Sequence, residues 1–447
     1  MRLSERLKQV PPVGTHAEPE PGATAEAYRA SKGELHRRLI DQLDLKAIER
    51  LPPDRLREEL RGVVGRMVGA SSIALNQAER ERLVQELLDD VTGLGPLEPL
   101  LADGTVSDIL VNTGSTVYVE RGGKLELTPV QFDSNDHLMH VINRIVSRVG
   151  RRVDETSPMV DARLPDGSRV NAIIPPLAID GPILSIRRFG RSPLRVKDLV
   201  GLGSVSRESI SFLAGCVRAK LNVVVSGGTG SGKTTMLNAL SAFVPEDERV
   251  VTIEDSAELQ LQQPHVVRLE TRPPNVEAKG EIVARDLVRN SLRMRPDRII
   301  IGEVRGAEVL DMLQAMNTGH EGSMTTIHAN SPRDALARLE AMIGMGGVQL
   351  SESASRQMIS RAIHLIAQLS RGTDGRRRLS SICEVTGMEG PTITMQEVFR
   401  FQHSGTDADG RVLGEYAFTG IRPRVMEQIE RSGIDPDQLL EKHLRGA

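Results

Sequence analysis

A glycine-rich octapeptide at residues 227–234, with the sequence GGTGSGKT, could hold phosphate groups. It matches the phosphate-binding pattern G-x-x-x-x-G-K-[ST] in full. Glycines let backbone N–H groups turn inward around phosphate oxygens, and a helix that follows would add the positive end of its dipole. Lys233 would bridge the β- and γ-phosphates, and the Thr234 hydroxyl would bind Mg²⁺. The predicted site for ATP comprises Gly227, Gly228, Thr229, Gly230, Ser231, Gly232, Lys233, Thr234 and Thr235.

The segments around this octapeptide suit the same chemistry. Residues 221–226, LNVVVS, read as a short apolar strand, and residues 235–240, TMLNAL, can open a helix. A strand, a glycine-rich turn and a helix in this order form the usual setting of a phosphate-binding loop. A glycine-rich turn with a chance lysine would lack this setting, so we favour nucleotide binding.

Carboxylates follow two further strand candidates. Residues 249–253 lead into Glu254 and Asp255, with Glu258 close behind, and a second apolar stretch leads into Glu303. The carboxyl ends of parallel strands meet at the ligand-binding edge of a sheet. We interpret Glu303 as the residue that orients or deprotonates the attacking water, and the earlier acids as acting on metal and water from the opposite side. Solvated turns are the alternative, which the upstream phosphate loop disfavours.

Two histidines complete the set of catalytic candidates. His328 ends the strand candidate at 324–328, so it would point toward the same edge. A histidine there could hydrogen-bond the γ-phosphate, directly or through a carboxylate, and report its loss. His320, in the short segment 319–322, is grouped with it. A histidine in a strand is as often a satisfied core group, and the residues alone leave both interpretations open.

The elements that must position these residues divide the 447-residue chain, which is too long for one compact core. From about residue 204 the pattern repeats strand, loop and helix, which favours an α/β fold with a mostly parallel sheet. The strand candidates lie at 221–226, 249–253, 298–302 and 324–328. We predict a flexible arm at 1–30, a helical bundle at 31–95, an α+β domain at 96–200, a P-loop ATPase domain at 204–434 and a tail at 435–447.

Local signals support the first half of this division. Leucines at 35, 39 and 43 recur with helical spacing, and Asn76 with Glu79 resembles a capping box. Residues 107–112 and 116–120 read as two strands joined by a turn. Further strands are expected at 169–174 and 183–188, and a helix at 137–149.

Composition limits the classes of protein that remain. The formal net charge is −3 and aromatic residues make up 2%, so few stacking platforms exist for a nucleic-acid motor. The two cysteines, Cys216 and Cys383, supply no disulfide framework or C-x-x-C spacing and are expected to be buried. No apolar run approaches the roughly 18–20 residues that cross a bilayer, and no signal peptide is evident, so we expect a cytoplasmic protein.

The order of the motifs resembles one family. The phosphate loop, residues 253–258 (IEDSAE), 301–305 (IGEVR) and 326–330 (TIHAN) look like the Walker A, Asp box, Walker B and His box of type II/IV secretion ATPases. Outside the site, residues 151–155 (RRVDE), 159–171 (MVDARLPDGSRVN) and 292–297 (LRMRPD) resemble the branch that assembles tight-adherence (Flp-type) pili. The resemblance covers roughly residues 90–400.

This resemblance implies a homo-hexamer at the cytoplasmic face of the inner membrane, acting on a membrane platform protein through ATP hydrolysis. It implies a RecA-like motor domain preceded by a PAS-like α+β domain, with ATP between them. Arginines of the preceding domain would reach the phosphates, and the candidates by motif position are Arg169, Arg187 and Arg188. From the residues alone, solvated arginines at a strand end remain the alternative.

Some features depart from the family pattern. Many type II secretion ATPases carry a four-cysteine zinc module, which two distant cysteines cannot supply, and this favours the tight-adherence branch. Gly302 and Glu303 stand where generic P-loop enzymes place an aspartate, so Mg²⁺ would depend more on Thr234 and water. We interpret the basic run 376–378 as a solvated loop. A conjugative or type IV secretion ATPase, a nucleic-acid motor and a nucleotide-gated scaffold remain as alternatives, and no direct contact with nucleic acid is expected.

Overall fold

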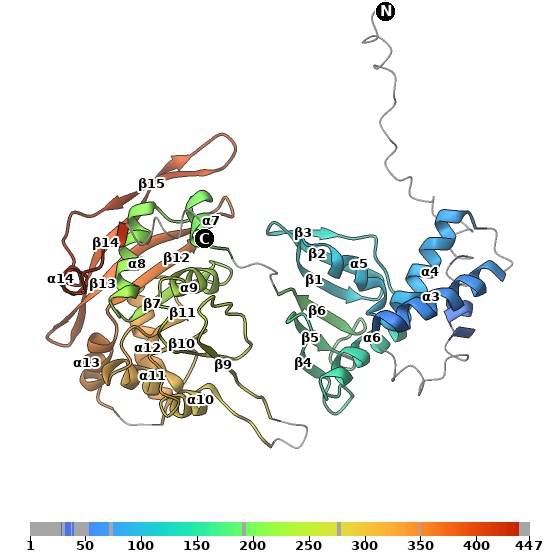
Figure 1. Ribbon diagram of the computed structural model, residues 1–447, viewed down its shortest axis with the longest axis horizontal. Coiled ribbons are helices and arrows are strands. Elements are labelled where there is room, and N and C mark those ends of the chain that lie inside the picture. The colour runs from blue at the N-terminus through green and yellow to red at the C-terminus, as the bar shows by residue number, and fades with distance from the viewer. Residues whose placement is uncertain are drawn as a thin grey trace, which may run out of the picture. The chain divides into compact units, whose positions relative to one another are not determined.

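The computed structural model describes residues 28, 32–36, 38–39, 53–70, 75–189, 194–274, 279–347 and 350–437 (Figure 1). The chain forms two compact units, which meet in the sequence between Arg188 and Phe189. The predicted arm at 1–30 lies outside the described residues except for Tyr28, and so does the predicted tail except for residues 435–437.

Two helices that pack against each other form the start of the first unit, α3 (Pro53–Ala70) and α4 (Gln77–Thr92). The predicted capping box is present at α4, because Asn76 Oδ1 accepts from Glu79 N–H at 2.9 Å and Glu79 Oε2 accepts from Asn76 N–H at 2.8 Å. Apolar side chains at helical spacing close a small core. Its buried members are Leu35, Leu39, Leu60, Val64, Val68, Leu83, Leu87 and Leu88.

An antiparallel sheet of six strands forms the rest of the first unit, in the order β3-β2-β1-β6-β5-β4. The strands are β1 (Val106–Thr113), β2 (Thr116–Arg121), β3 (Lys124–Leu127), β4 (Met159–Arg163), β5 (Arg169–Ile173) and β6 (Ile183–Arg187). The sheet shares its core with α6 (Asn135–Arg148), and two short elements precede it, η2 (Gly95–Leu97) and α5 (Glu98–Ala102).

The second unit has the predicted α/β fold, built on a nine-stranded sheet in the order β15-β14-β13-β12-β7-β11-β10-β8-β9. The six strands β12, β7, β11, β10, β8 and β9 pair in parallel. Strands β13, β14 and β15 extend the sheet beyond β12 with antiparallel pairing, which the sequence did not predict. The strands are β7 (Val223–Gly227), β8 (Val250–Glu254), β9 (Val266–Glu270), β10 (Arg298–Ile301), β11 (Met324–His328), β12 (Leu365–Arg371), β13 (Arg377–Glu389), β14 (Thr392–Thr406) and β15 (Val412–Phe418).

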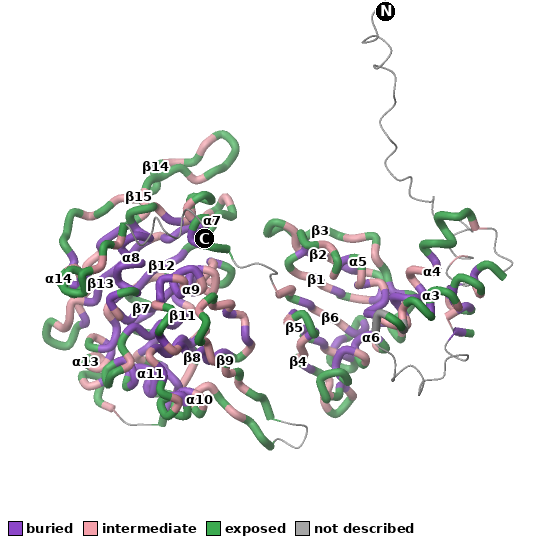
Figure 2. Tube along the Cα trace, in the orientation of Figure 1, coloured by how far each residue is buried: buried purple, intermediate pink, exposed green. Residues whose placement is uncertain are grey.

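Helices cover both faces of this sheet. Val223 and Val225 share one apolar core with α8 and α9, whereas Val224 shares the other with α10 to α13. All residues of β7, β8 and β10 are buried, as expected for strands covered on both faces, and they form the buried centre in Figure 2. The helices are α7 (Val196–Gly201), α8 (Arg207–Arg218), α9 (Lys233–Ser241), α10 (Ala284–Ser291), α11 (Glu308–Asn317), α12 (Pro332–Met345), α13 (Glu352–Ala362) and α14 (Met426–Arg431).

Two sequence features can be placed in this fold. Cys216 and Cys383 are free thiols, and both are buried as predicted. Across the part of the chain that the structure describes, no helix has the length and apolarity that crossing a bilayer requires.

Candidate active site

The phosphate loop lies between β7 and α9, as its sequence predicts. Gly230 and Gly232 have φ angles of 67° and 96°, in the left-handed region that glycine adopts without strain. Gly227 has no room for a side chain, because a Cβ there would lie 2.4 Å from Ser231 Oγ and 2.8 Å from Leu369 O. The turn therefore depends on glycine for both its conformation and its close packing.

Lys233 is half-buried at the first position of α9. Its Nζ donates to the carbonyl oxygens of Gly227 and Gly228, at 3.1 and 3.0 Å. Burial lowers the pKa of Lys233; the charge of Glu303 opposes this, and those of Arg305 and Arg338 add to it. The lysine therefore shares one electrostatic neighbourhood with an acid and two arginines.

Strand ends bring three predicted residues to the edge of the sheet that carries the phosphate loop. The registers pair His328 of β11 with Gly227 of β7, and Ile301 of β10 with Ile253 of β8. Glu254 is the last residue of β8, and Glu303 follows β10 closely. The expectation that these side chains meet at one carboxyl edge is met in the geometry, although their catalytic roles stay predictions.

Glu254 is buried, with one oxygen engaged and one not. Its Oε1 accepts from the N–H groups of Glu258 and Leu259, at 2.9 Å each, while Oε2 is buried with no hydrogen-bond partner among the described residues. Burial raises the pKa of Glu254, and the two backbone donors oppose that rise. Gly302 allows the close approach, since a Cβ there would lie 2.8 Å from Glu254 Cγ.

Arg305 joins acids that follow two neighbouring strands. Its Nη2 donates to Glu303 Oε2 at 2.7 Å, and its Nη1 lies 3.7 Å from Asp255 Oδ2. Asp255 Oδ1 also accepts from the Thr271 hydroxyl at 3.3 Å. Sequence reasoning placed Arg305 in a motif without giving it a role, although its position two residues after Glu303 was a usable signal.

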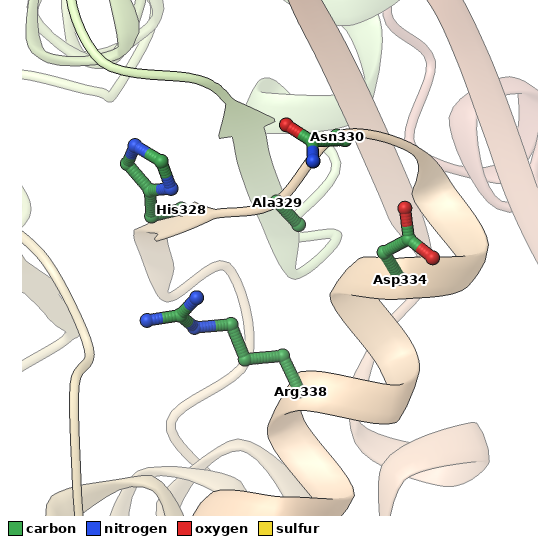
Figure 3. Close-up of a pocket in the computed structure, with 5 residues that line it drawn as sticks. All are labelled: His328, Ala329, Asn330, Asp334 and Arg338. Carbon is green, nitrogen blue, oxygen red and sulfur yellow. The ribbon is translucent and has the colours of Figure 1, made fainter.

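His328 contacts the phosphate loop directly. Its Nε2 and Thr229 Oγ1 share a hydrogen bond of 2.8 Å, whose direction depends on the histidine tautomer. The ring is half-buried, so His328 is no core histidine. Beside it opens a pocket lined by His328, Ala329, Asn330, Asp334 and Arg338 (Figure 3).

His320 does not join this group. Its backbone N–H donates to Ala315 O at 3.2 Å, and its carbonyl accepts from Ser323 Oγ at 2.8 Å. Asn222, which precedes β7, accepts from the N–H of Ser323 at 3.0 Å. His320 therefore lies where β7 and β11 begin, at the edge of the sheet opposite the phosphate loop, and this position gives no support to the predicted catalytic role.

The basic run 376–378 leaves the turn of a hairpin and enters β13 beside the phosphate loop, so the predicted solvated loop fits the exposed Arg376 but not the buried Arg378. Arg377 Nε donates to Gly230 O at 2.9 Å. Arg378 is buried and pairs with Asp374 at 2.6 Å. The local sequence could not predict these contacts, because they result from the pairing of β12 with β13 and of β12 with β7.

The three predicted arginines of the first unit lie close together at the end of its sheet. Arg169 and Arg187 are partners in the register of β5 and β6. Arg187 Nε donates to Asp108 Oδ1 at 3.1 Å, and Arg188 Nη1 donates to the carbonyl oxygen of Asp103. Each is thus held by the first unit's own residues or strand pairing, and their contact with nucleotide stays a prediction.

Comparison with known proteins places these features in a family. The family model described as "Type II/IV secretion system protein" matches residues 90–414. A putative conjugal transfer protein of Mycobacterium tuberculosis (strain H37Rv) is 41% identical over 311 residues, covering 68% of this chain and 88% of the relative. The conjugal transfer protein TrbB of Rhizobium radiobacter is 33% identical over 318 residues, covering 69% and 91%.

A solved structure is similar over much of its length. The VirB11 ATPase of the Brucella suis type IV secretion system, crystallised in complex with sulphate, is 28% identical to this chain. The match covers 64% of this chain and 91% of that one, with a TM-score of 0.36.

Proposed function

This chain belongs to the type II/IV secretion system protein family, and we propose that it hydrolyses ATP to drive a secretion or pilus machine. One observation carries the proposal: the phosphate loop, Glu303 and His328 meet at one edge of the parallel sheet, and His328 bonds to Thr229 within the loop. A nucleotide-gated scaffold would need the loop but not the acid beside it.

The residues at this edge divide the work of phosphoryl transfer. Backbone N–H groups of the loop and Lys233 bind the phosphates. Glu303 orients the attacking water and accepts its proton. Glu254, Asp255 and Glu258 act on the metal and the water from the end of the neighbouring strand. His328, held by Thr229, reports whether the terminal phosphate is present.

The residues suit a magnesium ion that binds with the nucleotide. Thr234 follows Lys233 and offers a hydroxyl oxygen, the kind of ligand that Mg²⁺ takes. The described residues include no group of three or more His, Cys, Asp or Glu that could hold a metal, so phosphates and water would supply the other ligands. Mg²⁺ would neutralise charge that develops on the phosphate oxygens.

Arg169, Arg187 and Arg188 would complete the site from the first unit. An arginine supplied this way is worth about 10³–10⁵ in rate in GTPases. We propose that the working form is a homo-hexamer in the cytoplasm, in which nucleotide changes the position of one unit against the other and acts on a membrane platform protein.

The cargo we propose is a tight-adherence pilus. The supporting residues are the stretches at 151–155, 159–171 and 292–297, which resemble that branch outside the ATP site. A conjugative or type IV secretion machine is the second candidate, favoured by the similarity to proteins named for conjugal transfer.

The first experiment measures ATP turnover by the purified protein beside Glu303→Ala, with the mass in solution determined with ATP present. We expect a hexamer in both cases, and a drop in turnover of about 10²–10⁴-fold in the variant with binding retained. Unchanged turnover in the variant would contradict the role of Glu303. A monomer without turnover would favour the scaffold.

The second experiment separates the cargoes. A strain that carries Lys233→Ala in place of the parent gene is examined for pili and for DNA transfer to recipient cells. Loss of pili with normal transfer supports the tight-adherence machine, whereas loss of transfer with normal pili supports the conjugative one.

A further inference from the structure

Arg338 is an arginine of the pocket beside the phosphate loop that no motif includes. It lies on α12, and in Figure 3 its guanidinium extends toward His328, which lines the same pocket. His328 in turn bonds to Thr229 of the phosphate loop at 2.8 Å. The pocket that Arg338 lines therefore shares His328 with the phosphate loop.

The guanidinium has no counter-charge of its own. Arg338 is exposed, and it forms no hydrogen bond or ion pair with the other described residues. Asp334 lies four residues earlier on the same helix, at the spacing where an aspartate and an arginine usually pair. Figure 3 shows the Asp334 carboxylate turned away from Arg338.

Arg338 instead adds to a concentration of positive charge. Together with Arg305 it lowers the pKa of Lys233, which burial has already lowered. Like charges repel one another, and an anion bound among them would offset that repulsion. Arg305 has carboxylate partners in Glu303 and Asp255, whereas Lys233 and Arg338 have no ion-pair partner among the described residues.

We propose that Arg338 binds the terminal phosphate of the nucleotide and so distinguishes a nucleoside triphosphate from a diphosphate. The inference rests on the proposed function. Lys233 and the loop hold the phosphates common to both nucleotides, whereas the guanidinium, with several N–H donors in one plane, suits the oxygens of the terminal group. Loss of that group would release Arg338, and α12 with it, from the phosphate loop.

The test compares the affinities of two nucleotides in matched variants. Arg338→Gln is measured beside Arg333→Gln, an exposed arginine at the start of the same helix that does not line the pocket. A non-hydrolysable ATP analogue and ADP are titrated into each protein. A hydrogen-bonded charge pair contributes enough that Arg338→Gln should bind the analogue about 10–100-fold more weakly. We expect ADP affinity to change less than about twofold, and Arg333→Gln to match the parent for both ligands.

The outcomes distinguish failure of the role proposed for Arg338 from failure of the proposed function. Equal weakening toward both ligands, or no change toward either, would overturn the role of Arg338 while leaving nucleotide binding intact. A parent protein that binds neither ligand would overturn the proposed function itself. If Arg338→Gln does not fold, Arg338→Lys carries the test: it keeps the charge but not the planar donors, so the analogue alone should bind several-fold more weakly, and unchanged binding would contradict the inference.

Discussion

Two lysines, Lys32 buried in the first unit and Lys233 half-buried in the second, show how a charge that stabilises a fold differs from a charge that binds a ligand. Lys32 in the first unit is 6% exposed, with its Nζ 3.0 Å from Asp90 Oδ2 and 3.8 Å from Asp133 Oδ2. Burial alone would lower the pKa of Lys32, but the surrounding acids raise it. The pKa of Lys233 moves the other way, because burial and two arginines outweigh one glutamate.

The histidines of the two regions repeat this difference. His137 lies between two carboxylates, with Nε2 3.5 Å from Asp90 and Nδ1 3.4 Å from Asp133. His328 contacts a hydroxyl of the phosphate loop. Around Lys32 and His137 each positive charge is matched by carboxylates of the protein, so this cluster leaves no charge for a ligand. At the phosphate loop the positive charges exceed their partners, and glycines keep the backbone accessible.

Replacing Lys233 should change ATP turnover more than any other change that distinguishes the phosphate loop from the first unit. We expect Lys233→Ala to lower ATP turnover by about 10²–10³-fold or more, because a preorganised charge that faces the phosphates is lost. The temperature of unfolding should stay the same or rise, since a partly buried and poorly paired charge is removed. Turnover and calorimetry on the same preparation check both parts, and a large fall in unfolding temperature would show that Lys233 holds the fold instead.

The matched change in the first unit should do the opposite. Lys32→Met leaves Asp90 buried beside fewer partners, and breaking a buried ion pair costs about 3–5 kcal/mol of unfolding free energy. ATP turnover should be unchanged at temperatures where the unit remains folded. Adding Asp90→Asn to Lys32→Met should restore part of the lost stability, and a failure to do so would mean that the charge pair is not the cause.

The pH dependence of stability should also differ between the units. Burial lowers the pKa of His137, but hydrogen bonds to Asp133 and Asp90 raise it to about 9. A base whose pKa is raised on folding stabilises fully below its ordinary value of 6.5, and that contribution is lost as the pH rises through 9. From the size of the shift, the loss is on the order of 3 kcal/mol.

Calorimetry of the parent and of His137→Gln from pH 6.5 to 9 tests this expectation. The parent should lose stability across the interval and the variant should not. His36, whose pKa burial lowers, has the opposite sign and acts below pH 6.5, outside the interval. An equal pH dependence in both proteins would assign the effect to another group.

The sequence predicted the parts of the fold that have local signals. Short apolar stretches bounded by glycine and charged residues placed β7, β8, β10 and β11 within two residues of their observed bounds. The carboxyl ends of parallel strands lie at one edge of the sheet, so residues at or just past those ends, Glu254, Glu303 and His328, could be expected there. The antiparallel strands β13 to β15 mix buried and exposed residues without strict alternation, and their pattern was not recognised.

Contacts between distant segments could not be predicted in the same way. Arg377 reaches Gly230 through strand pairing alone, and the cluster of Lys32, Asp90 and His137 joins three segments that share no motif. His320 was grouped with His328 because the two are close in sequence. His320 precedes β11 and His328 ends it, so the length of the strand places the two histidines at opposite edges of the sheet.

The smallest predicted effects on stability and turnover come from replacing two arginines that each form ion pairs with two acids. Arg121 in the first unit bonds to Asp103 and Glu126, both at 2.9 Å, while Arg305 joins Glu303 and Asp255. Both side chains reach solvent, so replacing either by alanine should change stability little. Arg305→Ala should still lower turnover, by about tenfold or less, because Glu303 loses the partner that orients it.

Arg121→Ala should leave turnover at the parent value, which makes it the control for Arg305→Ala. The result for Arg305 is sharpened by repeating the change in Asp255→Asn, since the two effects add if Arg305 acts through Glu303 and do not add if it acts through Asp255. Equal turnover in both alanine variants would mean that an arginine between two acids is the same surface feature in both units. The difference between the regions would then rest on the glycine loop and Lys233 alone.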